Sequence, residues 1–326
     1  MQITGFPRIH VGLTDLGFAS QRRFGGVGFA IDYPITVMEF NGSSEFALTG
    51  LDGLDLPARA ELQRIFVRLQ DLARAKPFCA HLSAHAPQHC GFGSKTTLVL
   101  SLIAGANEFL KLGLSREQMQ LMSGRGGTSG IGIHTFFAGG VICDGGHPSH
   151  LGAQLLPSSA RSKPLLAPPV LSWMGFPQQW KVVLLLGKDR SLSGAEEAEF
   201  FRRNAPIERQ DALETIAIIH HGVLPAFATA DRPALARALS DLHSHGFKLR
   251  ELLRCDSVTQ DCYRHLSALG CAVGLSSMGP LLYVLINRDD GDELDRVNKV
   301  AAIAGATVYA EIGGRNIGYE LAELSR

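Results

Sequence analysis

The sequence predicts an α+β fold, because its opening third consists of short strand patterns and its second half alternates strand patterns with helix patterns. In the opening third, glycines and charged turns separate the extended runs Arg8–Leu13, Val27–Asp32 and Thr36–Phe40, as a strand meander requires. Beyond residue 179, the buried strand pattern Trp180–Leu186 is the first of several that alternate with helix patterns. Such alternation is typical of an α+β or split βαβ layer.

Length and composition indicate a soluble globular chain with a large core. The chain has 326 residues, of which 45% are hydrophobic and 19% are charged, so it is long enough for about two domains and too apolar to be disordered. Lys plus Arg and Asp plus Glu each total 31. Because nonspecific nucleic-acid binding needs a basic excess, this balance predicts that nucleic acid is not a partner.

Cysteine usage and the start of the chain predict a cytoplasmic protein. The six cysteines include no C-x-x-C pair, and several stand beside apolar residues, so we expect free thiols in a reducing compartment. The first residues lack a basic and then apolar leader. No run of about 18 apolar residues occurs, so we expect neither a spanning helix nor a membrane partner.

Besides the three extended runs of the opening third, the first half is expected to contain three helices and two more strands. Gly113 is placed to end the helix expected over about 96–112, and Ser115 is the expected N-cap of the helix over 115–122. The helix patterns cover residues 57–75, about 96–112 and 115–122, and the strand patterns cover 79–85 and 136–143.

Prolines divide the chain into two predicted domains. Pro164, Pro168, Pro169 and Pro177 indicate a linker near 155–179. We therefore expect a first domain over residues 1–165 and a second over residues 166–326. In the second domain, helices are predicted over 196–203, 211–220, 233–242 and 292–305, and strands over 180–186, 281–286 and 307–312.

The segment around which the chain is organised is residues 89–97, a glycine-rich turn that leads into a helix. Such a turn presents unpaired backbone N–H groups and the positive end of the helix dipole, which form an anion site that phosphate usually occupies. The spacing is neither that of a Walker loop nor G-x-G-x-x-G. The alternative is a simple helix cap with Ser94 or Thr96 as N-cap. The residues expected to contact the anion are Gly91, Gly93, Ser94, Lys95, Thr96 and Thr97.

A second glycine-rich segment, residues 123–132, contains five glycines and one arginine. Arg125 offers a fork of donors to a phosphate, and Thr128 and Ser129 add hydroxyl donors. Gly126 and Gly127 supply the backbone of this candidate substrate site. The alternative is a close crossing of two backbones, which glycine permits.

Two more segments carry polar groups at the ends of predicted strands. Asp144 is a candidate Mg²⁺ ligand, with water and substrate oxygens completing the shell, and His147 is a candidate substrate contact. The alternative is a turn closed by an Asx hydrogen bond. In the other half, Gly274–Gly279 carries Ser276 and Ser277 and is placed to close over the first turn. Together, the segments predict a cleft for a multiply phosphorylated small molecule.

Zinc and hydrolase chemistry are disfavoured. His81, His85 and His89 are spaced by four residues, but Pro87 breaks any helix that would align them. The remaining histidines lack cysteine or carboxylate partners at ligand spacing, so ordinary hydrogen-bonded histidines are expected. Neither a G-x-S-x-G elbow nor a Ser-His-Asp order occurs.

In their order along the chain, these segments resemble the GHMP kinase superfamily and, within it, the β-ribofuranosylaminobenzene 5′-phosphate synthases. The resemblance covers nearly the whole chain. It implies a GHMP kinase-like two-domain fold, with an N-terminal S5-like α/β domain and a C-terminal ferredoxin-like domain, and a homodimer. The matching pieces are Pro7–Leu16, Arg23–Gly28, His89–Ser94, Gly124–Gly132, Gly139–His147, Leu192–Glu197, Leu224–Ala226 and Ser276–Pro280.

The resemblance implies a transferase that uses phosphoribosyl pyrophosphate with Mg²⁺. It joins C1 of the ribose to a carbon of a carboxylated aromatic or heteroaromatic acid, and pyrophosphate and CO₂ leave. The product is a C-riboside, as in methanopterin or C-nucleoside antibiotic biosynthesis. Because the ring loses CO₂, it need not surrender a proton, which fits the lack of an obvious general base. We assign catalysis to Lys95, Arg125 and Asp144, the metal to Asp144, and the lining of the site to Arg8, His10 and Asp15, with Asp32 as a weaker candidate.

Departures from the family pattern predict a divergent branch. Lys95 and Thr97 replace a glycine and a glutamine of the family's phosphate loop, and Met278 stands where the late loop usually carries Trp. Residues 254–260 also lack the usual Gln-Gly-Gly. The smaller, flexible Met278 would suit a different acceptor, such as a carboxylated pyrazole. The rival interpretations are an ATP-dependent small-molecule kinase of the same fold and a ligand-binding or scaffold protein without activity.

Overall fold

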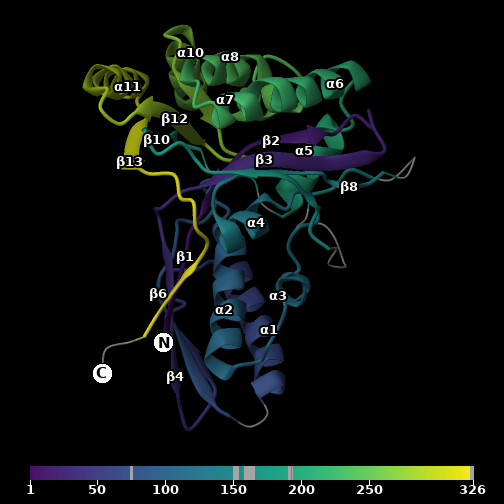
Figure 1. Cartoon of the computed structure of the whole chain (residues 1–326), viewed down its shortest axis with the longest axis vertical. Helices are drawn as coiled ribbons and strands as arrows, with labels where there is room; N and C mark the ends of the chain where they lie inside the picture. Colours follow the sequence, from purple (N-terminus) through teal and green to yellow (C-terminus); the bar gives the residue numbers. More distant parts are fainter. Residues whose placement is uncertain (74–75, 150–153, 158–165, 190–191, 193, 324–326) are drawn as a thin grey trace.

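The computed structural model describes residues 1–73, 76–149, 154–157, 166–189, 192 and 194–323. This part of the chain contains three sheets and the helices that cover them, arranged as an elongated molecule (Figure 1). The first sheet lies at one end with helices α1 to α3, the second crosses the middle with α6 above β2, and the third lies at the other end beside α8, α10 and α11. The mixture of helix and strand confirms the predicted α+β class.

The first sheet joins the two ends of the described chain. Its strand order is β14-β1-β4-β6-β5, so the last strand pairs with the first. Helices α1 (Leu56–Ala73) and α2 (Ser94–Leu110) pack on it. Leu62 of α1 and Leu102 of α2 share a core with Phe40 and Phe78 of the sheet. The strands are β1 (Gln2–Gly5), β4 (Thr36–Gly42), β5 (Ala47–Thr49), β6 (Phe78–Ala84) and β14 (Glu320–Ala322).

The second sheet carries one wall of the site described below. Its order is β2-β3-β7-β9, with β8 paired to the start of β3. Helix α4 (Ile131–Ala138) contacts β3 and β7 of this sheet and also α2, so it connects the second sheet to the first layer. The strands are β2 (Arg8–Asp15), β3 (Arg22–Ala30), β7 (Val141–Asp144), β8 (His147–Pro148) and β9 (Val170–Met174).

The third sheet is antiparallel and buried on both faces. Val182 and Leu184 of its strand β10 enter one core with the second sheet and helices α7 and α8, whereas Val183 and Leu185 enter another. Because successive side chains of a strand point to opposite faces, a strand between two cores reads as a continuous apolar run. The order is β11 (Ala272–Leu275), β12 (Leu281–Asn287), β10 (Trp180–Leu186) and β13 (Thr307–Ile312).

Of the helices in the second half, α7, α8, α10 and α11 cover the third sheet, whereas α6 packs on β2 of the second. Helices α10 and α11 contribute to the core that holds Val183 and Leu185, and α9 begins at Gly246, where φ is 57°. A π-helical turn, η2 (Ile219–Val223), joins α6 to α7. The helices are α5 (Ala195–Asn204), α6 (Arg209–Ile218), α7 (Leu224–Ala228), α8 (Arg232–Leu242), α9 (Gly246–Arg254), α10 (Ser257–Ala268) and α11 (Gly291–Ala304).

Locally encoded elements were predicted well. Ser115 caps α3 (Arg116–Ser123) and forms a capping box with Gln118, as expected. The strand predicted over 136–143 was wrong at its start, because α4 continues to Ala138 and only then does Gly139, at φ 64°, end the helix. The predicted linker contains the strand β9, and the sequence analysis did not identify α9 and α10.

The division into two domains stays a prediction. Its boundary between 165 and 166 lies at the edge of residues 158–165, which are outside the described residues, as is Pro164 of the predicted linker. Strands from both sides of that boundary share sheets, since β9 pairs with β7 and β14 pairs with β1. Among the described helices, none combines the length and apolarity needed to cross a membrane.

Candidate functional site

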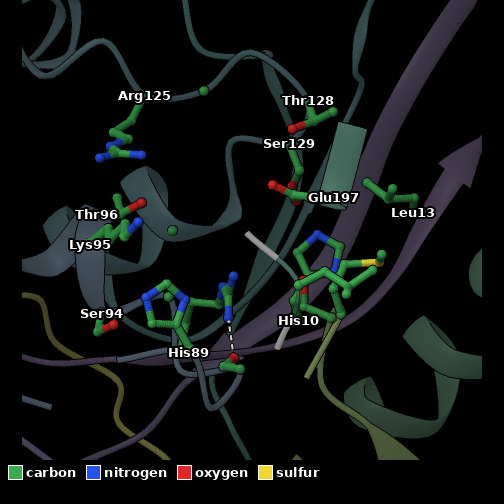
Figure 2. A pocket seen from close by; sticks show the side chains of 18 of the residues that line it. His10, Leu13, His89, Ser94, Lys95, Thr96, Arg125, Thr128, Ser129 and Glu197 are labelled. Atoms are coloured by element: carbon green, nitrogen blue, oxygen red, sulfur yellow. Dashed lines mark hydrogen bonds between the residues drawn. The ribbon is translucent and has the colours of Figure 1, made fainter. Parts of the chain in front are cut away.

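One pocket gathers most of the predicted site residues. It has a volume of about 250 Å³ and is lined by β2, the turn before α2, the loop that precedes α4, helices α5 and α9, and the loop between β11 and β12. In Figure 2, Arg125, Lys95 and His89 lie toward one side of the view, and His10 and Leu13 lie toward the other. The predicted residues that line it are Arg8, His10, Gly91, Gly93, Ser94, Lys95, Thr96, Arg125, Gly126, Thr128, Ser129 and Ser277.

The turn before α2 requires its glycines. Gly91 has φ 102° and Gly93 has φ 70°, which side chains rarely adopt, and a Cβ on Gly91 would stand 2.9 Å from the carbonyl oxygen of Ser276. Gly93 is the N-cap of α2, and no side chain caps the helix. The alternative with Ser94 or Thr96 as N-cap was therefore wrong. Of the first-turn N–H groups, that of Thr96 donates to the Gly93 carbonyl at 3.0 Å, whereas those of Ser94 and Lys95 have no partner among the described residues and stay available to a ligand in the pocket.

Two cations of the pocket have no carboxylate partner among the described residues. The Arg8 guanidinium donates from Nη1 to the carbonyl of Gly91 at 2.6 Å, and its buried Nε has no partner. Burial lowers the pKa of Arg8 to about 10, so it stays charged at neutral pH. Lys95, in the first turn of α2, makes no ion pair within the described part of the chain. Both are placed to attract an anion.

Two further basic side chains are held by carboxylates from the start of α1. Arg125 lines the pocket but pairs through Nη2 with Oε2 of Glu61, so part of its predicted donor fork is already used. His89, in the turn, bonds through Nε2 to Oδ2 of Asp55 at 2.6 Å. Asp55 immediately precedes α1, and Glu61 lies in its second turn. One helix end therefore orients two of the pocket's basic side chains.

Asp144 organises the loop beside the pocket and does not line it. Its Oδ2 accepts hydrogen bonds from Ser129 Oγ at 2.8 Å and from the Gly130 N–H at 2.9 Å, and its Oδ1 accepts from the Gly146 N–H at 2.9 Å. Its burial raises the pKa to about 6, although these hydrogen bonds and Arg22 act in the opposite direction. The bond from Gly146 is the Asx turn weighed as the alternative.

These contacts do not fit Asp144 as the ligand of a resident magnesium ion. Both carboxylate oxygens are occupied by donors within the protein, and the residue is only 1% exposed. Within the described ranges, no group of three or more His, Cys, Asp or Glu side chains is arranged to hold a metal. Mg²⁺ prefers several oxygen ligands in octahedral geometry, so Asp144 alone does not supply a site.

Six other candidates lie outside the lining of the pocket. Asp15 accepts three backbone N–H groups and the Ser20 hydroxyl and so closes its own turn. Thr97 Oγ1 donates to the Phe6 carbonyl, and Nε2 of His147 bonds to the Gly126 carbonyl. Ser276 Oγ donates to the Gly91 carbonyl at 2.9 Å. Gly127 is buried and does not line the pocket, and the weaker candidate Asp32 accepts from the Gly313 N–H.

The apolar side of the pocket was missed by sequence reasoning. Leu13, Phe201 and Met278 line it, and of these only Met278 was singled out from the sequence. His10 and Leu13 are three residues apart on β2 yet line one pocket, because a register shift between His10 and Gly12 breaks the alternation of the strand. The other lining residues missed are His89, Gly132, Ile133, Leu192, Gly194, Glu197 and Glu251.

A neutral imidazole stands at this apolar side. Burial, with added effects from Arg8 and Lys248, lowers the pKa of His10 well below its ordinary value. Its ring nitrogens make no hydrogen bond within the described part of the chain. Nearby, Lys248 and Glu251 of α9 form a buried ion pair at 2.9 Å. Neutral His10 is thus an unused hydrogen-bond acceptor that faces the pocket.

The fold is that of the GHMP kinases. The phosphomevalonate kinase of Streptococcus pneumoniae superposes with a TM-score of 0.70 at 9% identity, covering 95% of this chain and 98% of that one. Homoserine kinase from Cytophaga hutchinsonii superposes with a TM-score of 0.65 at 16% identity, covering 98% and 96%. At these identities the likeness shows the fold alone. The family model described as GHMP kinases N terminal domain matches residues 60–140, which include the turn and Arg125.

Sequence relatives decide the family. A β-ribofuranosylphenol 5′-phosphate synthase of Archaeoglobus fulgidus is 31% identical over 290 residues, covering 87% of each chain. A second, from Methanothermobacter thermautotrophicus, is 29% identical over 318 residues, covering 95% of each. The chain belongs to the β-ribofuranosylphenol 5′-phosphate synthase family. This confirms both the synthase resemblance and the predicted enzyme class, and it places a synthase on a fold that kinases share.

Two of the predicted departures from the family pattern lie in the pocket. Lys95 and Met278 both line it, whereas Thr97 points to the Phe6 carbonyl instead. The relatives are named for a phenol, and the resemblance first identified was named for an aminobenzene. Both names describe a benzene ring that carries a ribofuranosyl group and one polar substituent.

Proposed function

We propose that this protein is a decarboxylative C-ribosyltransferase that joins C1 of phosphoribosyl pyrophosphate to a ring carbon of a carboxylated aromatic acid, releasing CO₂ and pyrophosphate. One observation carries the proposal: a single pocket has cations and free helix N–H groups at one end and apolar side chains with a neutral histidine at the other. The family of the chain supplies the reaction class.

The cationic end suits the diphosphate of the donor. Arg8 and Lys95 have no carboxylate partners within the described residues, and the uncapped first turn of α2 adds N–H donors. Negative charge on the pyrophosphate increases as its bond to C1 breaks. Fixed donors that face this charge stabilise the transition state more than the ground state. Gly91 and Gly93 allow the backbone to approach the phosphate oxygens.

The apolar end suits the aromatic acceptor. Leu13, Phe201 and Met278 offer a surface for a ring, and His10 offers a hydrogen-bond acceptor to a hydroxyl or amino substituent. A donated hydrogen bond from that substituent pushes electron density to the opposite ring carbon. In an acid whose carboxylate is para to the substituent, the carbon that bears the carboxylate is therefore the nucleophile.

The reaction balances without removal of a ring proton. The electron pair of the C1–oxygen bond leaves with pyrophosphate, and a pair from the ring forms the new C–C bond. The bond between the ring and its carboxylate then breaks, CO₂ leaves, and that pair restores aromaticity. The chain's own residues bind the donor, orient the ring and hold the substituent's proton.

The metal, the assembly and the pathway belong to the same proposal. We propose that Mg²⁺ arrives with the donor's diphosphate, because it is commonly bound through substrate phosphates and few protein ligands. Asp144 does not fit as its ligand. A homodimer is proposed from the fold family, and sedimentation velocity tests it. The acceptor decides whether the product serves methanopterin-type or C-nucleoside biosynthesis.

Mass spectrometry of reactions with phosphoribosyl pyrophosphate and Mg²⁺ tests the proposal. The acceptor panel contains 4-hydroxybenzoate, 4-aminobenzoate and a pyrazole carboxylate. We expect a C-riboside 5′-phosphate with the mass expected after loss of CO₂, and equimolar pyrophosphate. A protein whose melting temperature rises with ATP and not with phosphoribosyl pyrophosphate would instead be a kinase of the same fold.

A further inference from the structure

We propose that His89 is the general acid that protonates the departing pyrophosphate and that Asp55 is the positioning residue that holds it. The inference rests on the proposed function of the same pocket and assigns one chemical step within it. His89 lines the pocket from the turn before α2, beside the residues placed on the donor's phosphates.

Both the backbone and the side chain of His89 are held in a fixed conformation. Its backbone is left-handed, with φ 57°, a conformation that a non-glycine residue keeps only when its surroundings demand it. Its Nε2 lies 2.6 Å from Oδ2 of Asp55. The backbone N–H of Asp55 donates to Oε1 of Gln88 at 2.8 Å, so the residue next to His89 holds Asp55 in turn.

Asp55 is itself rigid because it starts a helix. Its Oδ1 accepts the N–H of Ala58 at 2.7 Å, the hydrogen bond of an N-cap at the start of α1. Burial alone would raise the pKa of Asp55, but the hydrogen bonds from His89 and Ala58 lower it, with Lys95 adding to the effect. An ionised carboxylate therefore faces the imidazole.

The contact with Asp55 decides which ring nitrogen of His89 can give a proton to a ligand in the pocket. A carboxylate only accepts, so Nε2 of His89 carries hydrogen, and Nδ1 is left for the pocket. Within the described residues, Nδ1 has no hydrogen-bond partner. The charges that face His89 are Asp55 before α1, Lys95 on α2 and Arg8 on β2, with Arg125 further along the pocket in its pair with Glu61.

The basic residues of the pocket are not equivalent as acids. Guanidinium groups such as Arg8 and Arg125 do not release a proton at neutral pH, and the ordinary ammonium of a lysine is a weak acid there. Histidine is the side chain suited to exchange a proton near neutrality. Of the four basic side chains around the anion end, His89 is therefore the one equipped for proton delivery.

The step conserves atoms and electrons. As the C1–oxygen bond breaks, its electron pair goes to the pyrophosphate oxygen, and the proton on Nδ1 of His89 moves to the leaving pyrophosphate. His89 is left neutral, still bonded to Asp55 through Nε2–H. Solvent restores the proton after pyrophosphate leaves. The C–C bond formation and loss of CO₂ at the acceptor ring are unchanged.

The test compares pH–rate profiles of the full-length wild type, His89→Gln, Asp55→Asn and His81→Gln, made with phosphoribosyl pyrophosphate and the accepted aromatic acid. Asn keeps the N-cap and an acceptor for Nε2–H but removes the charge. His81, on β6, bonds to Thr49 Oγ1 outside the pocket and serves as the control. Pyrophosphate affinity of each variant is measured by calorimetry.

We expect His89→Gln to lower kcat by about 10²-fold or more and to abolish the fall in rate on the basic side, with pyrophosphate affinity changed by less than about tenfold. Asp55→Asn should lower kcat about tenfold and move the basic limb to lower pH, because the imidazolium has lost its carboxylate. His81→Gln should match the wild type.

Two results overturn the inference in distinguishable ways. If His89→Gln keeps the basic limb, or loses affinity while kcat is retained, His89 only contributes charge to binding and the general-acid role is refuted. In that case the wild type still forms the C-riboside, and the proposed function stands. A wild type that forms no C-riboside with any acceptor overturns the proposed function, and the inference with it.

Discussion

The guanidinium of Arg8 donates to the carbonyl oxygen of Gly91 at 2.6 Å and so joins the second sheet to the turn before α2. The contact is reinforced in the backbone, since the N–H of Arg8 donates to the carbonyl of Phe92 at 3.2 Å. Ser276, from the late loop, donates to the same Gly91 carbonyl. Segments from three distant parts of the sequence thus fix one peptide group, and the pocket is preformed around it.

Replacing Arg8 with Lys should distinguish two roles of Arg8, namely holding the turn before α2 and binding phosphoribosyl pyrophosphate. A lysine keeps the charge but lacks the fork that reaches Gly91 and a phosphate together. We expect the affinity for phosphoribosyl pyrophosphate to fall about tenfold or more, measured by calorimetry. Arg64→Lys, on the exposed surface of α1, is the control and should change nothing. Unchanged donor affinity in Arg8→Lys would show that Arg8 serves the turn alone.

Replacing Lys95 with Ala should weaken donor binding without unfolding the protein. Lys95 is in the first turn of α2 and has no ion pair among the described residues, so its removal leaves no carboxylate unpaired. We expect donor affinity to fall about 10- to 100-fold, with a salt dependence weaker than that of the wild type. Equal affinities would mean that the turn is only a helix start and that the donor binds elsewhere.

Local signals explain what the sequence predicted correctly. The capping box of Ser115 and the positive φ angles of Gly91 and Gly93 depend on neighbouring residues, so spacing alone indicated them. Residues 131–138 form a short segment in which apolar residues surround His134 and Thr135, a pattern that does not distinguish strand from helix. That ambiguity produced the wrong strand start at Phe136.

The remaining site features arise from tertiary structure. Asp55 lies 34 residues from His89, and Glu61 lies 64 residues from Arg125, so only folding brings the pairs together. The bulge in β2 that turns His10 and Leu13 toward one pocket leaves no mark in the alternation of apolar residues. Asp144 was predicted from the sequence as a metal ligand, but the buried donors that occupy its carboxylate could not be seen there.

Shortening Met278 should affect the acceptor and leave the donor unaffected. Its side chain is 6% exposed and lines the apolar end of the pocket. Met278→Ala removes contact area from the ring, so we expect the KM for the aromatic acid to rise about tenfold while the affinity for phosphoribosyl pyrophosphate is unchanged. Met122→Ala, outside the pocket, controls for loss of methionine packing. If only the KM for phosphoribosyl pyrophosphate rises, the aromatic acid does not bind at Met278.

Asp144 should make the protein more stable in mild acid than at neutral pH. Burial raises its pKa in the folded protein to about 6, above the ordinary value of 3.8. Because the folded state binds this proton more tightly than the unfolded state, the contribution to stability is fully present below 3.8 and is lost as pH rises through 6. A pKa difference of this size between the folded and unfolded states corresponds to about 3 kcal/mol in the free energy of unfolding.

Urea unfolding of the wild type and of Asp144→Asn between pH 4 and pH 7 measures this contribution. Other buried groups titrate in the same window, so the informative quantity is the difference between the two proteins. We expect the unfolding free energy of the wild type to fall relative to that of the variant as pH rises from about 4 to 6.5, by up to about 3 kcal/mol. A pH-independent difference would mean that Asp144 is ionised throughout, in which case its bonds from Ser129 and Gly130 outweigh its burial.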